Sequence, residues 1–278
     1  MKAVRVIAQQ DGSLTIVPLP LPTTQRKGDT SAERYRQQSR GEVPAGNQFN
    51  PIPSNYLRAI RLSDGKFKGL ASQASSLLTI VISGAVTVIA GPSQTTELVA
   101  GDHLLTDVKS APGVTLDVRN QARLVQLDVA ADWPGPEAEI QGPGTINPRD
   151  GGTPNIKRVY KGEGADDKAY FAEFAAELFP SVADQWSVPA KLAGFRMLCW
   201  ENGWMDFHPC VRNQIGILGS GQLEIEVGGG SGEKQVFRAG DICLSEDTTG
   251  EGHANRVTGA MHTTNLVVDP DHRWPNRL

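Results

Sequence analysis

The chain has 278 residues, a formal net charge of −4 and a pI near 5.8. Hydrophobic residues make up 39% of it and charged residues 21%, a balance that is ordinary for a globular protein and excludes a chain that is disordered throughout. The slightly acidic total offers no basic surface for the phosphates of nucleic acid, so small molecules or other proteins are the expected partners.

The cysteines and the apolar runs bear on the compartment. Cys199, Cys210 and Cys243 are odd in number and form no C-x-x-C pair, which argues against a disulfide framework and favours a reducing compartment. No segment approaches the ~18 consecutive apolar residues that cross a bilayer. We therefore predict a cytoplasmic protein without a membrane partner.

Short strands dominate the first half of the chain. Strands are predicted at 3–8 and 13–18, and the polar segment 23–50 is predicted to form a surface loop or a short helix. From Tyr56 to Asp132, apolar runs are interrupted by turns roughly every 8–12 residues, which indicates a sandwich or barrel of antiparallel strands. The chain also has 30 glycines and 18 prolines, a content that fits many tight turns.

The middle of the chain separates two β-rich halves. The segment 133–155 is rich in Gly and Pro and is predicted to be a linker. One amphipathic helix is predicted at 167–179, because apolar side chains recur there at helical spacing: Tyr170, Phe171, Phe174 and Leu178. The β pattern returns from Leu192. We predict an N-terminal barrel with an N-terminal arm at 1–132, the linker at 133–155 and a C-terminal barrel at 156–278.

An internal repeat supports two copies of one β-unit. Ser83-Gly84 recurs as Ser220-Gly221, an offset of 137 residues, and Ala100-Gly101-Asp102 recurs as Ala239-Gly240-Asp241, an offset of 139. Each copy therefore has a strand that ends in SG, a hairpin, and AGD followed by an apolar strand. The second hairpin is two residues longer than the first. Duplication of one unit is the simplest explanation.

This arrangement resembles the cupin barrel, and two copies in one chain resemble a bicupin. The resemblance implies an all-β fold with two cupin-type jelly-roll barrels, with a short helix before the second. The second half, with the phrases DFHPCVRNQ and EDTTGEGH, resembles functionally uncharacterised small bacterial cupins. In cupins, two motifs supply three His and one Glu to a divalent metal inside the barrel.

The family motifs can be carried over to the second copy one position at a time. His208 stands at the second His position and His253 at the last, whereas Asp206 replaces the first His and Gln214 replaces the Glu. The second motif lacks its usual Pro, and Asn255 follows His253 by two positions rather than four. Because residues two apart on a strand share a face, Asp206 and His208 are expected to point into the barrel together.

Two readings of this donor set remain open. Two imidazoles and one carboxylate with open positions are typical of non-haem Fe(II), although Mn, Ni, Co or Zn would also fit. Alternatively, metal was lost when Asp206 and Gln214 replaced the ligands, and His208 and His253 line a small-molecule pocket. The first copy carries no such His set, so we assign its barrel a structural or interface role.

Two further residues are candidates for catalysis. Arg212 could clamp a substrate carboxylate, although a salt bridge at the surface or strand edge is the commoner fate of such a residue. His262 could act as a general acid or base, or could simply be exposed on its strand.

The sequence supports three functional hypotheses. The first is a metal-dependent enzyme of oxygenase, isomerase or lyase type that acts on a small polar organic molecule. The second is a metal-free barrel that binds a small molecule without converting it. The third is a structural protein that forms a homodimer through the ligandless first barrel.

Overall fold

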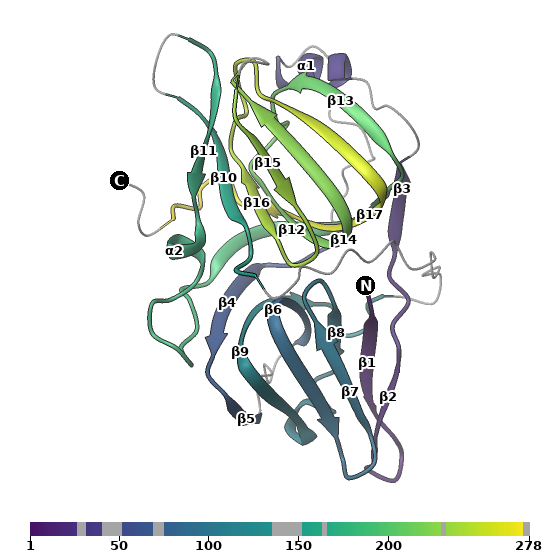
Figure 1. Cartoon of the computed structure of the whole chain (residues 1–278). Helices are drawn as coiled ribbons and strands as arrows, with labels where there is room; N and C mark the ends of the chain where they lie inside the picture. Colours follow the sequence, from purple (N-terminus) through teal and green to yellow (C-terminus); the bar gives the residue numbers. More distant parts are fainter. Residues whose placement is uncertain are drawn as a thin grey trace.

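A computed structural model describes residues 1–26, 32–40, 52–68, 75–134, 152–162, 166–228 and 232–274. Figure 1 shows two β-barrels, one above the other. The lower, first barrel contains β1 (Ala3–Ala8), β2 (Leu14–Pro18), β4 (Tyr56–Leu62), β5 (Gly65–Lys68), β6 (Ser76–Ala90), β7 (Thr95–Val99), β8 (His103–Thr106) and β9 (Val114–Val129). The second contains β3 (Thr23–Arg26), β10 (Ile156–Lys161), β11 (Ala169–Glu173), β12 (Ala190–Trp200), β13 (Gly203–His208), β14 (Gln214–Val227), β15 (Lys234–Phe237), β16 (Ile242–Ser245) and β17 (His253–Val268).

The predicted all-β fold class with two barrels is confirmed. Helices are short: α1 (Ala32–Ser39), the 3₁₀ turn η2 (Ala111–Gly113) and α2 (Ala175–Leu178), which precedes the long strands of the second barrel. Among the described residues, no helix is both long enough and apolar enough to span a membrane. In each barrel, two long antiparallel strands form the central pair, β6 with β9 and β14 with β17.

The repeated AGD turn makes the same contacts in both barrels. Asp102 and Asp241 are buried, at 5% and 0% exposure, and each accepts hydrogen bonds from two backbone N–H groups. One N–H belongs to the residue three positions before the aspartate. The other belongs to the residue just before β1 or β10, the strands that pair in parallel with β8 and β16. The donors are Val99 and Lys2 for Asp102, and Arg238 and Asn155 for Asp241.

The glycine before each aspartate lies where the two barrels touch. Gly101 and Gly240 have φ angles of +87° and +84°, which side chains disfavour. A Cβ at Gly101 would lie 2.3 Å from the carbonyl oxygen of Gly219, and one at Gly240 would lie 2.2 Å from that of Ile82. These contacts are related by the repeat, since Ile82 and Gly219 are also 137 residues apart. Two copies of one turn therefore dock the barrels against each other.

The docked surfaces are apolar and form one continuous core. A single cluster of buried side chains includes Ile80 and Leu127 from the first barrel and Ile217 and Leu244 from the second. A side-chain hydrogen bond also crosses it, between His103 Nε2 and Thr264 Oγ1 at 3.1 Å. The burial of this apolar surface holds the two barrels together.

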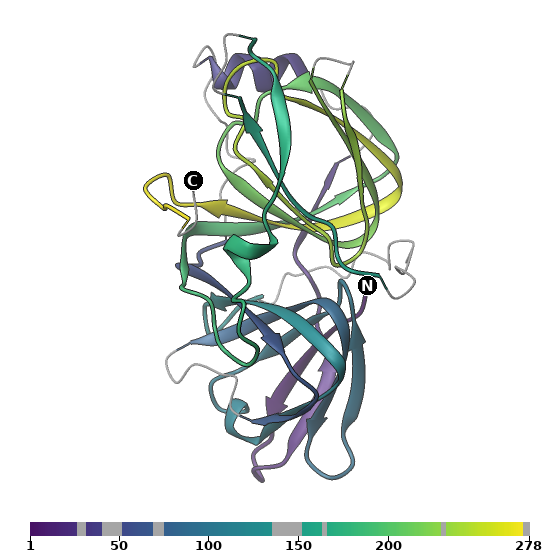
Figure 2. The ribbon, with the colours of Figure 1, turned by 60° about the vertical axis from the view of Figure 1, so that its left-hand side comes forward.

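Each barrel is also contacted by chain from the other half. β3 pairs in parallel with β12, and α1 packs on β13, so the N-terminal arm that was assigned to the first domain lies against the second barrel. Both views place α1 at the end of the second barrel that is farthest from the first (Figures 1 and 2). Conversely, the backbone N–H groups of Asp184 and Ser187 donate to carbonyls of β4.

The prediction of a helix at 167–179 is wrong for most of these residues. Residues 169–173 form β11, which pairs antiparallel with β10 and places Tyr160 opposite Tyr170, and only α2 is helical. Aromatic residues favour strands, and the partner strand decided between the two structures. Of the predicted linker 133–155, residues 135–151 lie outside the described chain, while Trp133 is buried with its ring edge against Phe195.

The docking glycines give a test of the two-barrel core. Gly91 has a φ of +84° with nothing within 4 Å of its Cβ position, so Gly91→Ala is expected to cost only the backbone strain, about 1 kcal/mol. Gly240→Ala adds overlap with the backbone at Ile82 and is expected to cost a further ~1–3 kcal/mol. Urea unfolding measures both values, and equal losses in the two variants would contradict this account of the interface.

Candidate metal and ligand site

The second barrel encloses a cavity of about 90 Å³. Its wall combines apolar side chains such as Trp200, Met205 and Ile225 with polar ones from five strands and the loop before β14. This volume corresponds to roughly half a dozen waters, which is room for a small polar molecule. The matching space in the first barrel is about 20 Å³, and Phe67 and Leu77 are among the residues that line it. Among the residues that the structure describes, the second barrel therefore has the larger interior space for a ligand.

His208 and His253 meet across two paired strands. The register of β13 and β17 places His208 opposite His253, and both side chains are buried at 3% exposure. Their ring centroids are 4.9 Å apart, and both residues line the cavity. The structure thus brings together the two histidines that the sequence singled out.

A hydrogen bond at Nδ1 fixes the orientation of each ring. His208 Nδ1 lies 2.7 Å from the backbone carbonyl oxygen of Asp206, and His253 Nδ1 lies 2.6 Å from Asp247 Oδ2. Since a carbonyl oxygen can only accept, Nδ1 of His208 carries the proton, and a neutral ring then has its lone pair on Nε2. Metal-binding histidines commonly have such a partner on the other ring nitrogen.

Asp206 does not join this group. Its side chain is 62% exposed and lies 3.5 Å from Arg36 Nη2 of α1. The expectation that Asp206 and His208 share a face fails because of a β-bulge. Met205 pairs with Asn255 and His208 with His253, so three steps on β13 match two on β17. The extra residue reverses the alternation of side chains between the two strands.

Asp247 and Cys210 lie beside His253 instead, although neither was predicted to be a ligand. One potential ligand atom from each of Cys210, Asp247 and His253 lies within 4.8 Å of the other two, and all three residues are buried. The backbone N–H of Cys210 donates to the carbonyl oxygen of Asp247 at 3.0 Å, which ties the two loops together. The sequence signals were their positions, Cys210 two residues after His208 and Asp247 six residues before His253.

The remaining predicted residues lie at different distances from this cluster. Gln214, at the start of β14, lines the cavity and donates from Nε2 to Cys210 Sγ at 3.7 Å. Arg212 is half-buried and also lines the cavity. His262 does not line it: Nδ1 of His262 lies 2.9 Å from Ser220 Oγ, and burial lowers the pKa of the imidazole. The structure therefore separates His262 from the other candidates.

The donor set of the cluster fits a cation. Asp247 is fully buried, and Asp247 Oδ1 has no hydrogen-bond partner among the described residues although Oδ2 is bonded to His253. A buried carboxylate with one oxygen lacking a donor is costly, and a cation bound at Nε2 of His253, the ring nitrogen opposite Asp247, would offset its charge. Imidazole, carboxylate, amide and thiol groups together are ligands for a transition metal rather than for Mg²⁺ or Ca²⁺.

Searches against known proteins find likenesses of fold only. No family model and no curated protein matches the chain. Among solved structures, a DUF861-family protein of unknown function from Pseudomonas syringae pv. tomato is 14% identical, covers 96% of this chain and 100% of its own, and has a TM-score of 0.37.

Two further matches are named as cupins or enzymes. A cupin 2 conserved barrel domain protein from Leptotrichia buccalis is 10% identical over 78% of this chain and 85% of its own, with a TM-score of 0.38. Oxalate decarboxylase from Bacillus subtilis, a protein with Mn(II) centres, is 15% identical over 79% of this chain and 70% of its own, with a TM-score of 0.26.

The buried thiols give a test of the electrostatics of the site. Burial, with a further contribution from the Asp247 charge, raises the pKa of Cys210 well above its usual range, and burial raises that of Cys243 to about 12. Both thiols therefore stay protonated at pH 8.5, and because the thiolate is the reactive form, we expect neither to be alkylated by iodoacetamide in the folded, metal-free protein. Mass spectrometry counts the modified cysteines, with guanidinium-unfolded protein as the control. Rapid labelling of native Cys210 would contradict the assignment.

Proposed function

We propose that the second barrel binds one divalent metal ion and uses it to act on a small polar organic molecule. The observation that carries this proposal is the pair of buried, facing imidazoles of His208 and His253, each held by a hydrogen bond at Nδ1. That arrangement presets both rings as ligands through Nε2. Fixing the rings in advance reduces the entropy that the protein would lose on binding the metal.

A third ligand is required, and Asp206 does not supply it. Asp247 accepts from Nδ1 of His253, on the opposite side of the ring from Nε2, so it orients the imidazole rather than binding a metal at Nε2. Gln214 and Cys210, which line the cavity, are the further donors there. Fe, Mn, Ni, Co and Zn accept two imidazoles together with such groups. A Cys210 thiolate in the ligand set would shift the preference toward Zn or Fe, since thiolates are soft ligands.

The surrounding residues define what the site can do. When bound, the metal would polarise a carbonyl or hydroxyl group of the substrate, which suits isomerase, lyase or oxygenase chemistry. Arg212 and Arg196 line the same cavity, which has no Asp or Glu in its wall, and would hold a substrate carboxylate. The apolar wall around Trp200 and Met205 excludes bulk water and strengthens these polar contacts.

One observation favours a second candidate function, a metal-free barrel that binds a small molecule without turnover. Asp206 faces outward and the Cys210 thiol is protonated, so two of the potential donors near His208 are unavailable as anions before metal binds. A thermal-shift screen of chelator-treated protein against small carboxylic acids tests this alternative. A ligand that binds only the folded state raises the melting temperature in proportion to its occupancy.

Metal content after purification without chelator separates the two functions. We expect about one equivalent in the wild type and little in His253→Ala or His208→Ala, because each variant removes an imidazole ligand. Asp206→Asn is the matched control and is expected to keep its metal, since its side chain faces away from the cavity. Inductively coupled plasma mass spectrometry measures all four proteins. A metal-free wild type, even after reconstitution with Fe, Mn, Co, Ni and Zn, would refute the metal-dependent function.

A further inference from the structure

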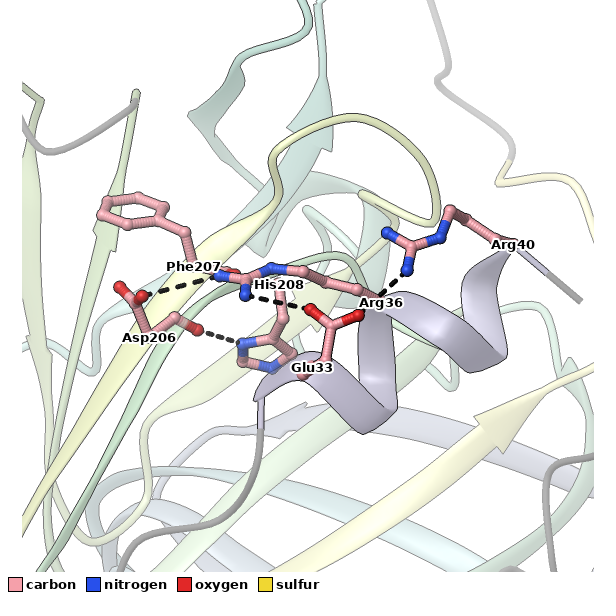
Figure 3. Close-up of polar contacts among 6 residues, drawn as sticks. All are labelled: Glu33, Arg36, Arg40, Asp206, Phe207 and His208. Atoms are coloured by element: carbon pink, nitrogen blue, oxygen red, sulfur yellow. Dashed lines mark hydrogen bonds and ion pairs between the residues drawn. The ribbon is translucent and has the colours of Figure 1, made fainter. Parts of the chain in front are cut away.

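An arginine from the N-terminal arm contacts the strand that carries His208. Arg36, on α1, lies 3.5 Å from Asp206 Oδ2 through Nη2 and donates from the same nitrogen to the carbonyl oxygen of Phe207. Its Nη1 lies 3.5 Å from Glu33 Oε2, one turn earlier on the helix. Figure 3 shows the guanidinium of Arg36 between the carboxylates of Glu33 and Asp206, and the ring of His208 turned toward the Asp206 carbonyl.

The contacted residues are the bulge of β13. Met205 and His208 are in register with β17, and the two residues between them are not. Their carbonyl groups have partners outside that ladder: the Asp206 carbonyl accepts from His208 Nδ1, and the Phe207 carbonyl accepts from Arg36. Because His208 takes its orientation from the Asp206 carbonyl, whatever fixes the bulge also fixes the imidazole.

The apolar side of α1 is part of the same structure. Ala32 is 8% exposed and belongs to one buried cluster with Trp200, Met205 and Met261, all three of which line the cavity. The helix therefore covers the end of the second barrel nearest His208, and this packing places Arg36 over the bulge. Residues far apart in the sequence are brought together by the arm.

The ion pair itself adds little to stability. The side chains of Arg36 and Asp206 are 33% and 62% exposed, and exposed pairs are largely screened by solvent. The contribution of Arg36 is therefore to geometry. The planar guanidinium holds Glu33 through Nη1 while Nη2 contacts the Asp206 carboxylate and the Phe207 carbonyl, and a lysine, with a single nitrogen on a flexible stem, fixes such a set of partners less well.

We propose that Arg36 is a positioning residue for the site of the second barrel: it clamps the β13 bulge, so that the Asp206 carbonyl holds His208 with its proton on Nδ1 and its Nε2 ready to bind a ligand. The binding of a ligand by that Nε2 rests on the proposed function, whereas the fixed orientation of the His208 ring does not. The site of the C-terminal half is thus incomplete without the N-terminal arm.

The first test needs no metal. Protein labelled with ¹⁵N-histidine reports the tautomer of each of the five histidines in long-range ¹H–¹⁵N spectra, and His208→Gln identifies the His208 signals. We expect the Nδ1-protonated form to dominate in the chelator-treated wild type and a mixture of tautomers in Arg36→Gln. Arg36→Lys should fall between them. Arg40→Gln, which removes an arginine paired with Glu33 on the same helix, should match the wild type.

The second test measures affinity. Calorimetric titration with Zn²⁺ is expected to show about tenfold weaker binding in Arg36→Gln, the size typical of losing an outer contact to a metal ligand, with unchanged stoichiometry and a melting temperature close to that of Arg40→Gln. If the wild type binds no metal, the proposed function fails and the tautomer still decides this inference. A His208 tautomer identical in the wild type, Arg36→Gln and Arg36→Lys would overturn it. Arg36→Lys keeps the charge and replaces Arg36→Gln in both tests if Arg36→Gln does not fold.

Discussion

Two buried carboxylates, Asp102 and Asp241, hold the turn on which each barrel depends. Each accepts two backbone N–H bonds, one from its own turn and one from the chain entering the parallel strand β1 or β10. Hydrogen bonds to a charged group are stronger than neutral ones, and losing one partner would leave a buried charge exposed to an apolar core. The glycine before each aspartate lets the same turn touch the other barrel. The closure of each barrel and the docking of the two barrels therefore depend on the same short turn.

The same scaffold gives one barrel a site and leaves the other filled. The serine of the SG repeat pairs with Arg123 in the first barrel and with His262 in the second. Neither of these two partners lines the interior cavity of its barrel. What distinguishes the second barrel is the β13 bulge, the loop before β14 and the turn before β17, which supply His208, Cys210 and Asp247. The fold therefore fixes where a site can form, and these three irregular segments decide its chemistry.

The sequence predicted the strands well because their residues alternate and their turns are marked by glycine. The predicted strand 3–8 coincides with β1, the predicted strand 13–18 coincides with β2 apart from its first residue, and the AGD repeat predicted the matching turns. The helix at 167–179 failed because its aromatic spacing fits both periods. At the site, the motif resemblance singled out His208 and His253, and the structure places both rings against the same cavity. The sequence prediction misplaced Asp206 and missed Asp247, because a bulge and a tertiary turn leave no periodic trace in the sequence.

Asp247 acts on the second barrel from outside the cavity. Its carboxylate is fully buried and accepts from Nδ1 of His253, which does line the cavity. That hydrogen bond leaves Nε2 of His253 as the ring nitrogen that can bind a metal or accept from a ligand, and the negative charge beside the ring makes Nε2 a stronger donor of its lone pair. A metal ion at Nε2 gains from this arrangement, and so does a ligand that brings its own N–H or O–H group. An apolar ligand, or a hydrogen-bond acceptor placed against Nε2, does not, so the two candidate functions share one requirement at this atom.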